Sequence, residues 1–210
     1  MIVLVLHRVV CGAWEGEGVP RTTSKRDDII AAATELIRSK GVHAASISAI
    51  IDASGASAGT IYHHFKNKND IVSAVALHAI AEPITAILTR PRSGPLSPGL
   101  LFHEVSEAVL GGHIDSALIV QLWAGSSTDP ELNAMLHGLM VAVRNVPVEF
   151  IAAWLLENGA TEAEASARAL PLAQVAVGQA MGLLAQRTLD PSLEREAYLH
   201  EAARMLDQMR

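Results

Sequence analysis

Hydroxyl, imidazole and ammonium side chains are concentrated between residues 46 and 68 of this chain. Hydroxyl and imidazole groups donate hydrogen bonds to phosphate oxygens, and lysines add the positive charge that a polyanion attracts. Two small residues among them, Ala58 and Gly59, would let a helix backbone approach a nucleic acid closely. We therefore expect a nucleic-acid-binding surface formed by Ser46, Ser57, Ala58, Gly59, Thr60, Tyr62, His63, Lys66 and Lys68.

The expected roles divide between the phosphate backbone and the bases. Base edges should lie nearest Ala58, Gly59 and His63, while the adjacent His64 should pack within its own domain. The expected phosphate anchors are Ser57, Thr60, Tyr62 and Lys68.

These groups need short helices to hold them on one face, and the sequence encodes a helix, a turn and a second helix. Ser46 can cap the first helix, and Ser57 is placed to cap the second. Gly55 can adopt the positive φ of a sharp turn between them. Apolar residues at helical spacing predict the buried sides of both helices: Ile47, Ile50, Ile51, Ile61 and Phe65. The interval 46–65 is thus a candidate helix-turn-helix, whose second helix enters the DNA major groove.

This stretch resembles the DNA-binding domain of the tetracycline-repressor (TetR) family of bacterial regulators. The string G-A-S-A-G-T-I-Y-H-H-F-K-N-K, residues 55–68, is specific to that domain, and the likeness extends over residues 23–83. Ile51 and Ser54 depart from the family pattern, because alanine is usual at both positions. The matching residues are Ser46, Ile47, Ile50, Gly55, Ser57, Gly59, Thr60, Ile61, Tyr62, His64, Phe65, Lys68 and Ile71.

The resemblance implies an all-α protein with an N-terminal three-helix DNA-binding domain at 23–83 and a helical effector-binding and dimerisation domain at 84–210. It also implies a cytoplasmic homodimer that binds double-stranded operator DNA. Repression relieved by a small molecule is the commoner mode of the family. Residues 1–20 are expected to be a poorly ordered extension, since their apolar run is too short to span a membrane and lacks the features of a secretory signal.

Charge is divided unevenly along the 210 residues, although the net charge is −6. Residues 21–70 hold seven Lys or Arg against five Asp or Glu, whereas residues 71–210 hold eight against fifteen. This asymmetry fits one DNA-facing domain attached to a body that repels DNA. Hydrophobic residues make up 50% and aromatic residues only 4% of the chain, which favours closely packed helices over a β-sandwich.

Capping signals and proline positions predict the remaining helices. A bracing helix should begin at Ser24 and end at Gly41, and a fourth helix should begin at Asn67 and be kinked or ended by Pro83. Its inner stripe should include Ile71, Val75 and His78. After a loop at 90–99, helices are expected at 98–110, 115–125, 130–158 with a bend at Pro147, 161–187 across Pro171, and from Asp190-Pro191 to residue 208.

The body contains two sets of candidate functional residues. Aromatic, apolar and a few polar side chains suggest a pocket for a neutral or mostly apolar effector, at Phe102, His103, Gln121, Trp123, Met135, Phe150 and Trp154. Small and apolar side chains on the last two helices suggest a dimer interface at Ala173, Ala176, Val177, Ala180, Leu184, Leu199 and Leu206. Either set could instead belong to an ordinary core.

Neither catalysis nor metal binding is indicated by the sequence. The nine histidines include no pair with the i, i+4 spacing of a helical zinc site, and Cys11 is the only cysteine. No nucleophile elbow, phosphate-binding loop or dinucleotide fingerprint is present. We therefore expect no catalytic residue, no metal and no cofactor.

Three alternatives stay open at this stage. The chain could be a constitutive regulator or an activator with no ligand, a helical enzyme or carrier with a DNA-binding head, or a non-specific architectural DNA protein. The last would need more positive charge than this sequence carries.

Overall fold

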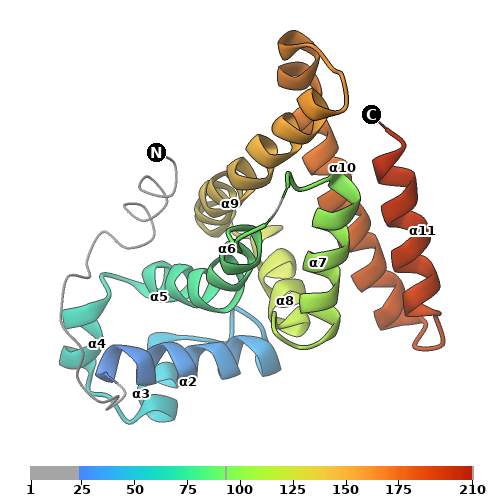
Figure 1. Ribbon diagram of the computed structural model, residues 1–210. Helices are drawn as coiled ribbons and strands as arrows, with labels where there is room; N and C mark the ends of the chain where they lie inside the picture. Colours follow the sequence, from blue (N-terminus) through green and yellow to red (C-terminus); the bar gives the residue numbers. More distant parts are fainter. Residues whose placement is uncertain (1–23, 93, 210) are drawn as a thin grey trace.

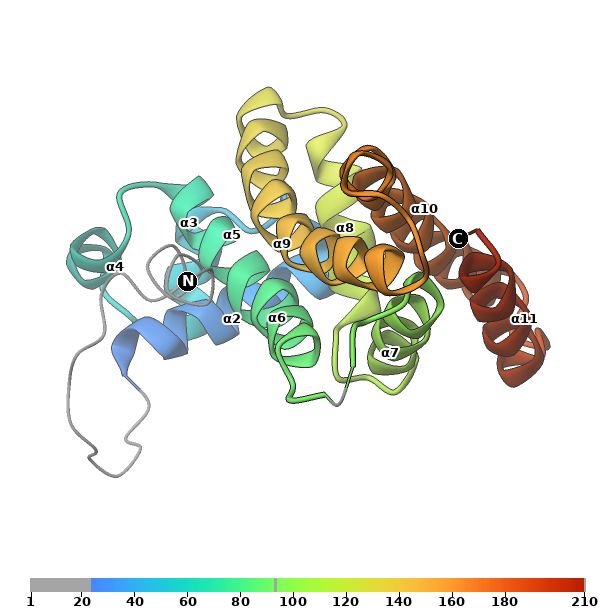
Figure 2. The ribbon, with the colours of Figure 1, turned by 45° about the horizontal axis from the view of Figure 1, so that its top comes forward.

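The computed structural model describes residues 24–92 and 94–209. Over these residues the chain is built from helices and contains no strand (Figure 1), as the sequence predicted. Figures 1 and 2 show an elongated arrangement in which α4 and α11 lie at opposite ends of the molecule.

Three short helices form the N-terminal head: α2 (Lys25–Lys40), α3 (Ile47–Ser54) and α4 (Ala58–His64). Each begins at a predicted serine cap, and Ser24 forms a reciprocal capping box with Asp27. Gly55 ends α3 with φ of 64°, in the left-handed region that favours glycine. The predicted helix-turn-helix is therefore confirmed as local structure.

One long connecting helix leaves the head, in three parts: α5 (Lys68–Ala76), a π turn η1 (Leu77–Ala81) and α6 (Glu82–Leu88). Pro83 does not end this helix. Proline has no N–H, so Pro83 cannot donate the usual helical hydrogen bond to the carbonyl of Ala79, four residues before it. Just before the proline, the Glu82 N–H donates to the carbonyl of Leu77, five residues back, where a regular α-helix would use the carbonyl four residues back. This longer hydrogen-bonded loop is a π turn, and the helix is wider there.

His78 lies on the outside of this connecting helix and not on its inner stripe. Its ring is exposed, and Nδ1 lies 3.0 Å from the Glu82 Oε2. His78 lies within the π turn and pairs there with Glu82 on the exposed side of the helix. A stripe counted at regular helical spacing does not describe this point.

Five helices form the C-terminal body: α7 (Pro98–Leu110), α8 (Ser116–Ser126), α9 (Pro130–Glu157), α10 (Glu162–Leu189) and α11 (Arg195–Asp207). The first four agree with the predicted ranges, and Pro147 and Pro171 lie inside the long helices. The last helix begins later than predicted, because Asp190 forms a turn. Its Oδ1 accepts hydrogen bonds from the N–H and hydroxyl of Ser192.

Two large hydrophobic clusters organise the packing. The head core contains buried residues of α2 to α5 such as Ile29, Ile50 and Ile61, but it also includes Leu118, Leu122 and Leu132 of the body. The body core joins α7, α9, α10 and α11 and contains Phe102, Ile151, Ala173, Ala176 and Leu199. The head is thus fastened to α8 and α9 by shared apolar packing.

Among the described residues, three helices are long and apolar enough to cross a membrane on length and composition alone: Lys68–Leu88, Pro130–Glu157 and Glu162–Leu189. In this fold the first of them is the connecting helix, and the other two are α9 and α10, the longest helices of the body. α9 and α10 pack against each other in the body core.

Candidate nucleic-acid interface

The surface of α4 carries most of the predicted DNA-binding residues. Ile61 and Phe65 are buried in the head core and anchor the helix from beneath. The opposite side is open to solvent: Ala58, Gly59 and His63 are exposed, and 59% of Tyr62 is exposed. A short helix held this way presents its first turn and its tyrosine to a partner.

Hydroxyl groups at the start of α4 are held in fixed positions. The Ser57 Oγ accepts a hydrogen bond of 3.1 Å from the Thr60 N–H and lies 2.9 Å from the Thr60 hydroxyl. Both side chains therefore serve the helix cap while Ser57 stays exposed. Ser46 has the same role in α3: its Oγ accepts from the Ala49 N–H and lies 2.9 Å from the exposed Ser48 hydroxyl.

His64 does not pack inside the domain as expected. It is exposed, and its ring meets the rings of His63 at 5.0 Å and Phe65 at 6.4 Å between centroids. The seven residues of α4 leave one buried side, which Ile61 and Phe65 already fill. Both histidines therefore belong to the solvent-facing surface.

The two lysines beyond α4 differ in their surroundings. Lys66 is exposed. The Lys68 Nζ lies 3.5 Å from the His43 carbonyl oxygen, and burial lowers the pKa of Lys68 while nearby Asp129 opposes that shift. Of the two ammonium groups, Lys66 is therefore the more accessible to a phosphate.

Beside Lys68, a polar contact that the sequence did not indicate joins the head to the body. We call this contact the joint: His43 and Asn69 on the head, Thr128 and Glu131 on the body. The His43 Nε2 lies 3.1 Å from the Thr128 Oγ1, and the Asn69 amide donates to the Glu131 Oε2 at 3.0 Å. The partners are 85 and 62 positions apart, so no local pattern could reveal them.

The predicted effector residues do not meet in one pocket. Phe102 is buried in the body core, with Phe150 and Trp154 packed against it. Met135 packs instead against the head core. The remaining residues lie elsewhere, since Gln121 approaches Gly41 of the head and His103 and Trp123 are exposed. Periodicity selected apolar side chains correctly but could not assign them to a common cavity.

Most of the predicted dimer residues are buried within the monomer itself. The monomer itself buries Ala173, Ala176, Leu184, Leu199 and Leu206, while Val177 and Ala180 are half-buried. Other apolar side chains in this part of the chain are exposed, and three of them, Val175 of α10, Met205 of α11 and Met209 just after α11, lie on one outer face. Apolar pattern alone did not separate the inner stripe from this outer one.

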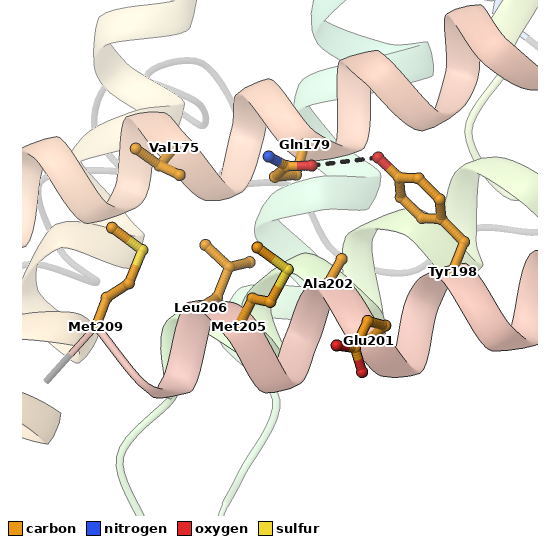
Figure 3. Close-up of a pocket in the computed structure, with 8 residues that line it drawn as sticks. All are labelled: Val175, Gln179, Tyr198, Glu201, Ala202, Met205, Leu206 and Met209. Atoms are coloured by element: carbon orange, nitrogen blue, oxygen red, sulfur yellow. Dashed lines mark hydrogen bonds between the residues drawn. The ribbon is translucent and has the colours of Figure 1, made fainter.

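That outer face contains an open groove of about 200 Å³ between α10 and α11. Figure 3 shows Met205 and Leu206 from α11, and Met209 just after it, lying opposite Val175, with Tyr198 pointing across to α10. The Tyr198 hydroxyl donates to the Gln179 Oε1 at 3.2 Å. The groove is thus largely apolar with a polar end. Elsewhere in the described chain, no cluster of three or more His, Cys, Asp or Glu is placed to hold a metal.

Part of this chain is similar in sequence to known transcriptional regulators. The family profile described as "Bacterial regulatory proteins, tetR family" matches residues 29–75. The HTH-type transcriptional regulator UidR of Escherichia coli (strain K12) is 28% identical over 127 residues, which cover 60% of this chain and 62% of UidR. The uncharacterized HTH-type transcriptional regulator YvdT of Bacillus subtilis is 36% identical over 70 residues, covering 33% of this chain and 36% of YvdT.

Solved structures share the fold over most of the chain. Salmonella enterica GusR superposes with a TM-score of 0.70 at 22% identity, covering 90% of this chain and 97% of GusR. The reduced form of Escherichia coli NemR superposes with a TM-score of 0.66 at 18% identity, covering 88% and 97%. The profile match lies in the head, whereas the structural likeness extends through the body.

Proposed function

Since this chain belongs to the tetR family of bacterial regulatory proteins, we propose that it is a homodimeric, sequence-specific DNA-binding regulator of transcription that acts in the cytoplasm. The observation that carries the proposal is α4, whose exposed first turn, Tyr62 and His63 stand on a buried base of Ile61 and Phe65. The proposed mode of binding places α4 in the major groove, with Ser57, Thr60, Tyr62 and Lys66 against phosphates.

A second copy of the chain is part of this proposal. A helix of seven residues reads few base pairs, so tight and specific binding needs two such helices. The groove between α10 and α11 and the exposed Leu170, Val175, Met205 and Met209 support an interface at the end of the molecule away from α4. The two copies of α4 would then reach half-sites about 34–36 Å apart.

Regulation by a small molecule is the third part of the proposal, with release of a repressor as the expected mode. The connecting helix runs from the head to the body, where its last part, α6, contacts α7 and α9. Its π turn is a local departure from regular helix. A ligand that prefers one arrangement of the body would change the separation of the heads through this helix and the joint. A tenfold change in DNA affinity needs about 1.4 kcal/mol of such preference.

The deciding experiment is DNA binding by the full chain. DNA upstream of its own gene is footprinted, and the protected segment is titrated by fluorescence anisotropy against random DNA of the same length. We expect a palindromic footprint and at least about a thousandfold preference over random DNA. Sedimentation should give a dimer, and Met205→Glu together with Val175→Glu should make it a monomer. Equal affinity for random DNA would exclude a sequence-specific regulator.

A further inference from the structure

Helix α8 belongs with the head by its packing, although it follows α7 in the chain. It makes its close helix contacts with α2 and α9. Leu118 and Leu122 of α8, with Leu132 of α9, are buried in the head core. Gly125 of α8 leaves little room beside Val42 of the head, and the joint adds hydrogen bonds between the same regions. The head, α8 and the first half of α9 therefore form one packed unit.

The other helices pack mainly among themselves. Helix α7 contacts α6, α10 and α11. Buried residues of these helices, and of α9 from Val146 onward, make up the body core. We call this set the distal unit (α6, α7, α9 from Val146, α10 and α11) and the first set the head unit (α2 to α5, α8, and α9 up to Leu139). A smaller buried cluster lies where the two units meet: Ile87, Ala108, Ile114, Ile119 and Leu184.

The described part of the chain passes between the two units at three places, and the first two depart from regular α-helix. Buried residues of the head core extend along the connecting helix to Ala76, and packing with the distal unit begins at Ile84. Between them lie the π turn η1 and Pro83. The second passage is the turn from α7 to α8, where Gly112 has φ of 78°, in the left-handed region.

Helix α9 makes the third passage. Its apolar residues pack on the head core up to Leu139 and enter the body core at Val146. Pro147 cannot donate a hydrogen bond to the carbonyl one turn back, so one helical bond is missing across this interval. Pro171 in α10 is different, because buried residues on both sides of it belong to the body core. Each passage between the units thus contains a local interruption of regular helix.

We propose that the head unit turns as a rigid body against the distal unit, about hinges at η1 with Pro83, at Gly112 and at Pro147. A regular helix resists bending, whereas prolines and π turns are the places where helices bend. The cluster between the units holds fewer buried residues than either core, so it is the surface along which they shift. Because α4 and α11 lie at opposite ends of the molecule (Figure 1), a small turn displaces α4 by a larger distance. The effect of that displacement on DNA rests on the proposed function, whereas the hinge itself does not.

Distances between two spin labels on the full chain, measured by electron paramagnetic resonance, test the proposal. In a Cys11→Ser background, one pair lies within the head unit, at Ala53→Cys and Ala124→Cys, and one spans the boundary, at Ala53→Cys and Ser166→Cys. All three label positions are exposed on helices. Excess unlabelled protein confines the measured distances to one chain. We expect the distance distribution across the boundary to be at least about twofold broader than the one within the head unit. Equal widths would overturn the proposal.

Proline variants test the cause of that breadth. Pro83→Ala together with Pro147→Ala restores two helical N–H donors, and it should narrow the distribution across the boundary by roughly half while leaving the pair within the head unit unchanged. Pro171→Ala is the matched control, because it restores a donor inside the distal unit, and it should change neither pair. Circular dichroism verifies that each variant is folded. A double variant with the native breadth, or a control that narrows it equally, would contradict the assigned hinges.

Operator binding is measured with the same labelled proteins, so that the two proposals fail separately. Native protein that prefers operator over random DNA but shows equal widths for both label pairs refutes the hinge and leaves the regulator intact. Protein whose breadth across the boundary depends on Pro83 and Pro147, but which shows no preference for operator, confirms the hinge and refutes the proposed function.

Discussion

The candidate surfaces of the head and the body are built in different ways. In the head, each element of the candidate interface lies within the 23 residues from Ser46 to Lys68, and local caps and one glycine turn place them. In the body, the groove depends on how two whole helices, α10 and α11, pack side by side, and the joint links residues 62 and 85 positions apart. A site built from residues close together in the sequence can thus be predicted from local patterns. A site built by the packing of separate helices depends on which faces of those helices meet, and local patterns do not determine that.

Residues of both regions nevertheless pack in the head core, and a substitution in that core tests whether the head and the body unfold together. Ile61 is fully buried beneath α4, so Ile61→Ala should lower the free energy of unfolding by about 2–5 kcal/mol and abolish operator binding. In a Trp14→Phe background, fluorescence reports Trp123 and Trp154 of the body, while circular dichroism reports all helices. Both signals should change at the same urea concentration, because Leu118 and Leu122 belong to the head core. Two separate transitions would show that the head unfolds by itself.

Gly125 tests the closest approach of the body to the head. A Cβ there would lie 3.1 Å from two atoms of Val42 and 3.2 Å from Leu132. Overpacking of about 1–3 kcal/mol should outweigh the gain in helix propensity of up to about 1 kcal/mol, so Gly125→Ala should destabilise the fold. Gly138→Ala is the matched control, because nothing lies within 4 Å of its Cβ, and it should stabilise α9. Urea titration of both variants separates the two effects. Equal stabilisation would mean that the packing of Gly125 against Val42 and Leu132 has room for a Cβ.

The two lysines beyond α4 test which region each one serves. Lys66→Ala should weaken binding similarly on all DNA sequences and lower the salt slope by about one unit, because its ammonium is free to reach a phosphate. Lys68→Ala should change the slope less if Lys68 keeps its place beside His43 and Asp129. Anisotropy titrations between about 50 and 200 mM salt measure both slopes. A full unit lost in Lys68→Ala would show that this side chain leaves the joint when DNA binds.

Among these changes, removing a hydrogen bond of the joint should have the smallest effect on stability. Asn69→Ala and Glu131→Ala remove the two sides of one exposed hydrogen bond of 3.0 Å. A double-mutant cycle should give a coupling energy of about 0.5 kcal/mol, near the lower end for such bonds. The same cycle on operator affinity shows whether the bond also holds the head in its DNA-binding position. A coupling energy near zero in both measurements would mean that this hydrogen bond does not help to hold the head against the body.

Sequence by itself determined most of the helices of this protein and the two sides, buried and exposed, of α4. Ser46, Ser57, Asn67 and Thr161 cap the helices they were expected to cap, since a cap is a contact within three residues. Ile61 and Phe65 were assigned to the inside of α4 because one short helix has a single apolar side. At Asp190 and His78 this local reasoning failed, because a turn and a π bulge competed with regular helix.

Only the tertiary structure decided which apolar stripe of each body helix faces inward. Ala173, Ala176 and Leu199 are as apolar as Val175 and Met205, yet the first three are buried in the monomer and the last two are exposed. When a helix is apolar on several sides, its sequence does not determine which side is buried. In this body, packing against α7 and α9 determines which side faces inward. The same packing buries the Ser106 hydroxyl without a hydrogen-bond partner among the described residues. That burial is a property of the assembled body, and no spacing in the sequence predicts it.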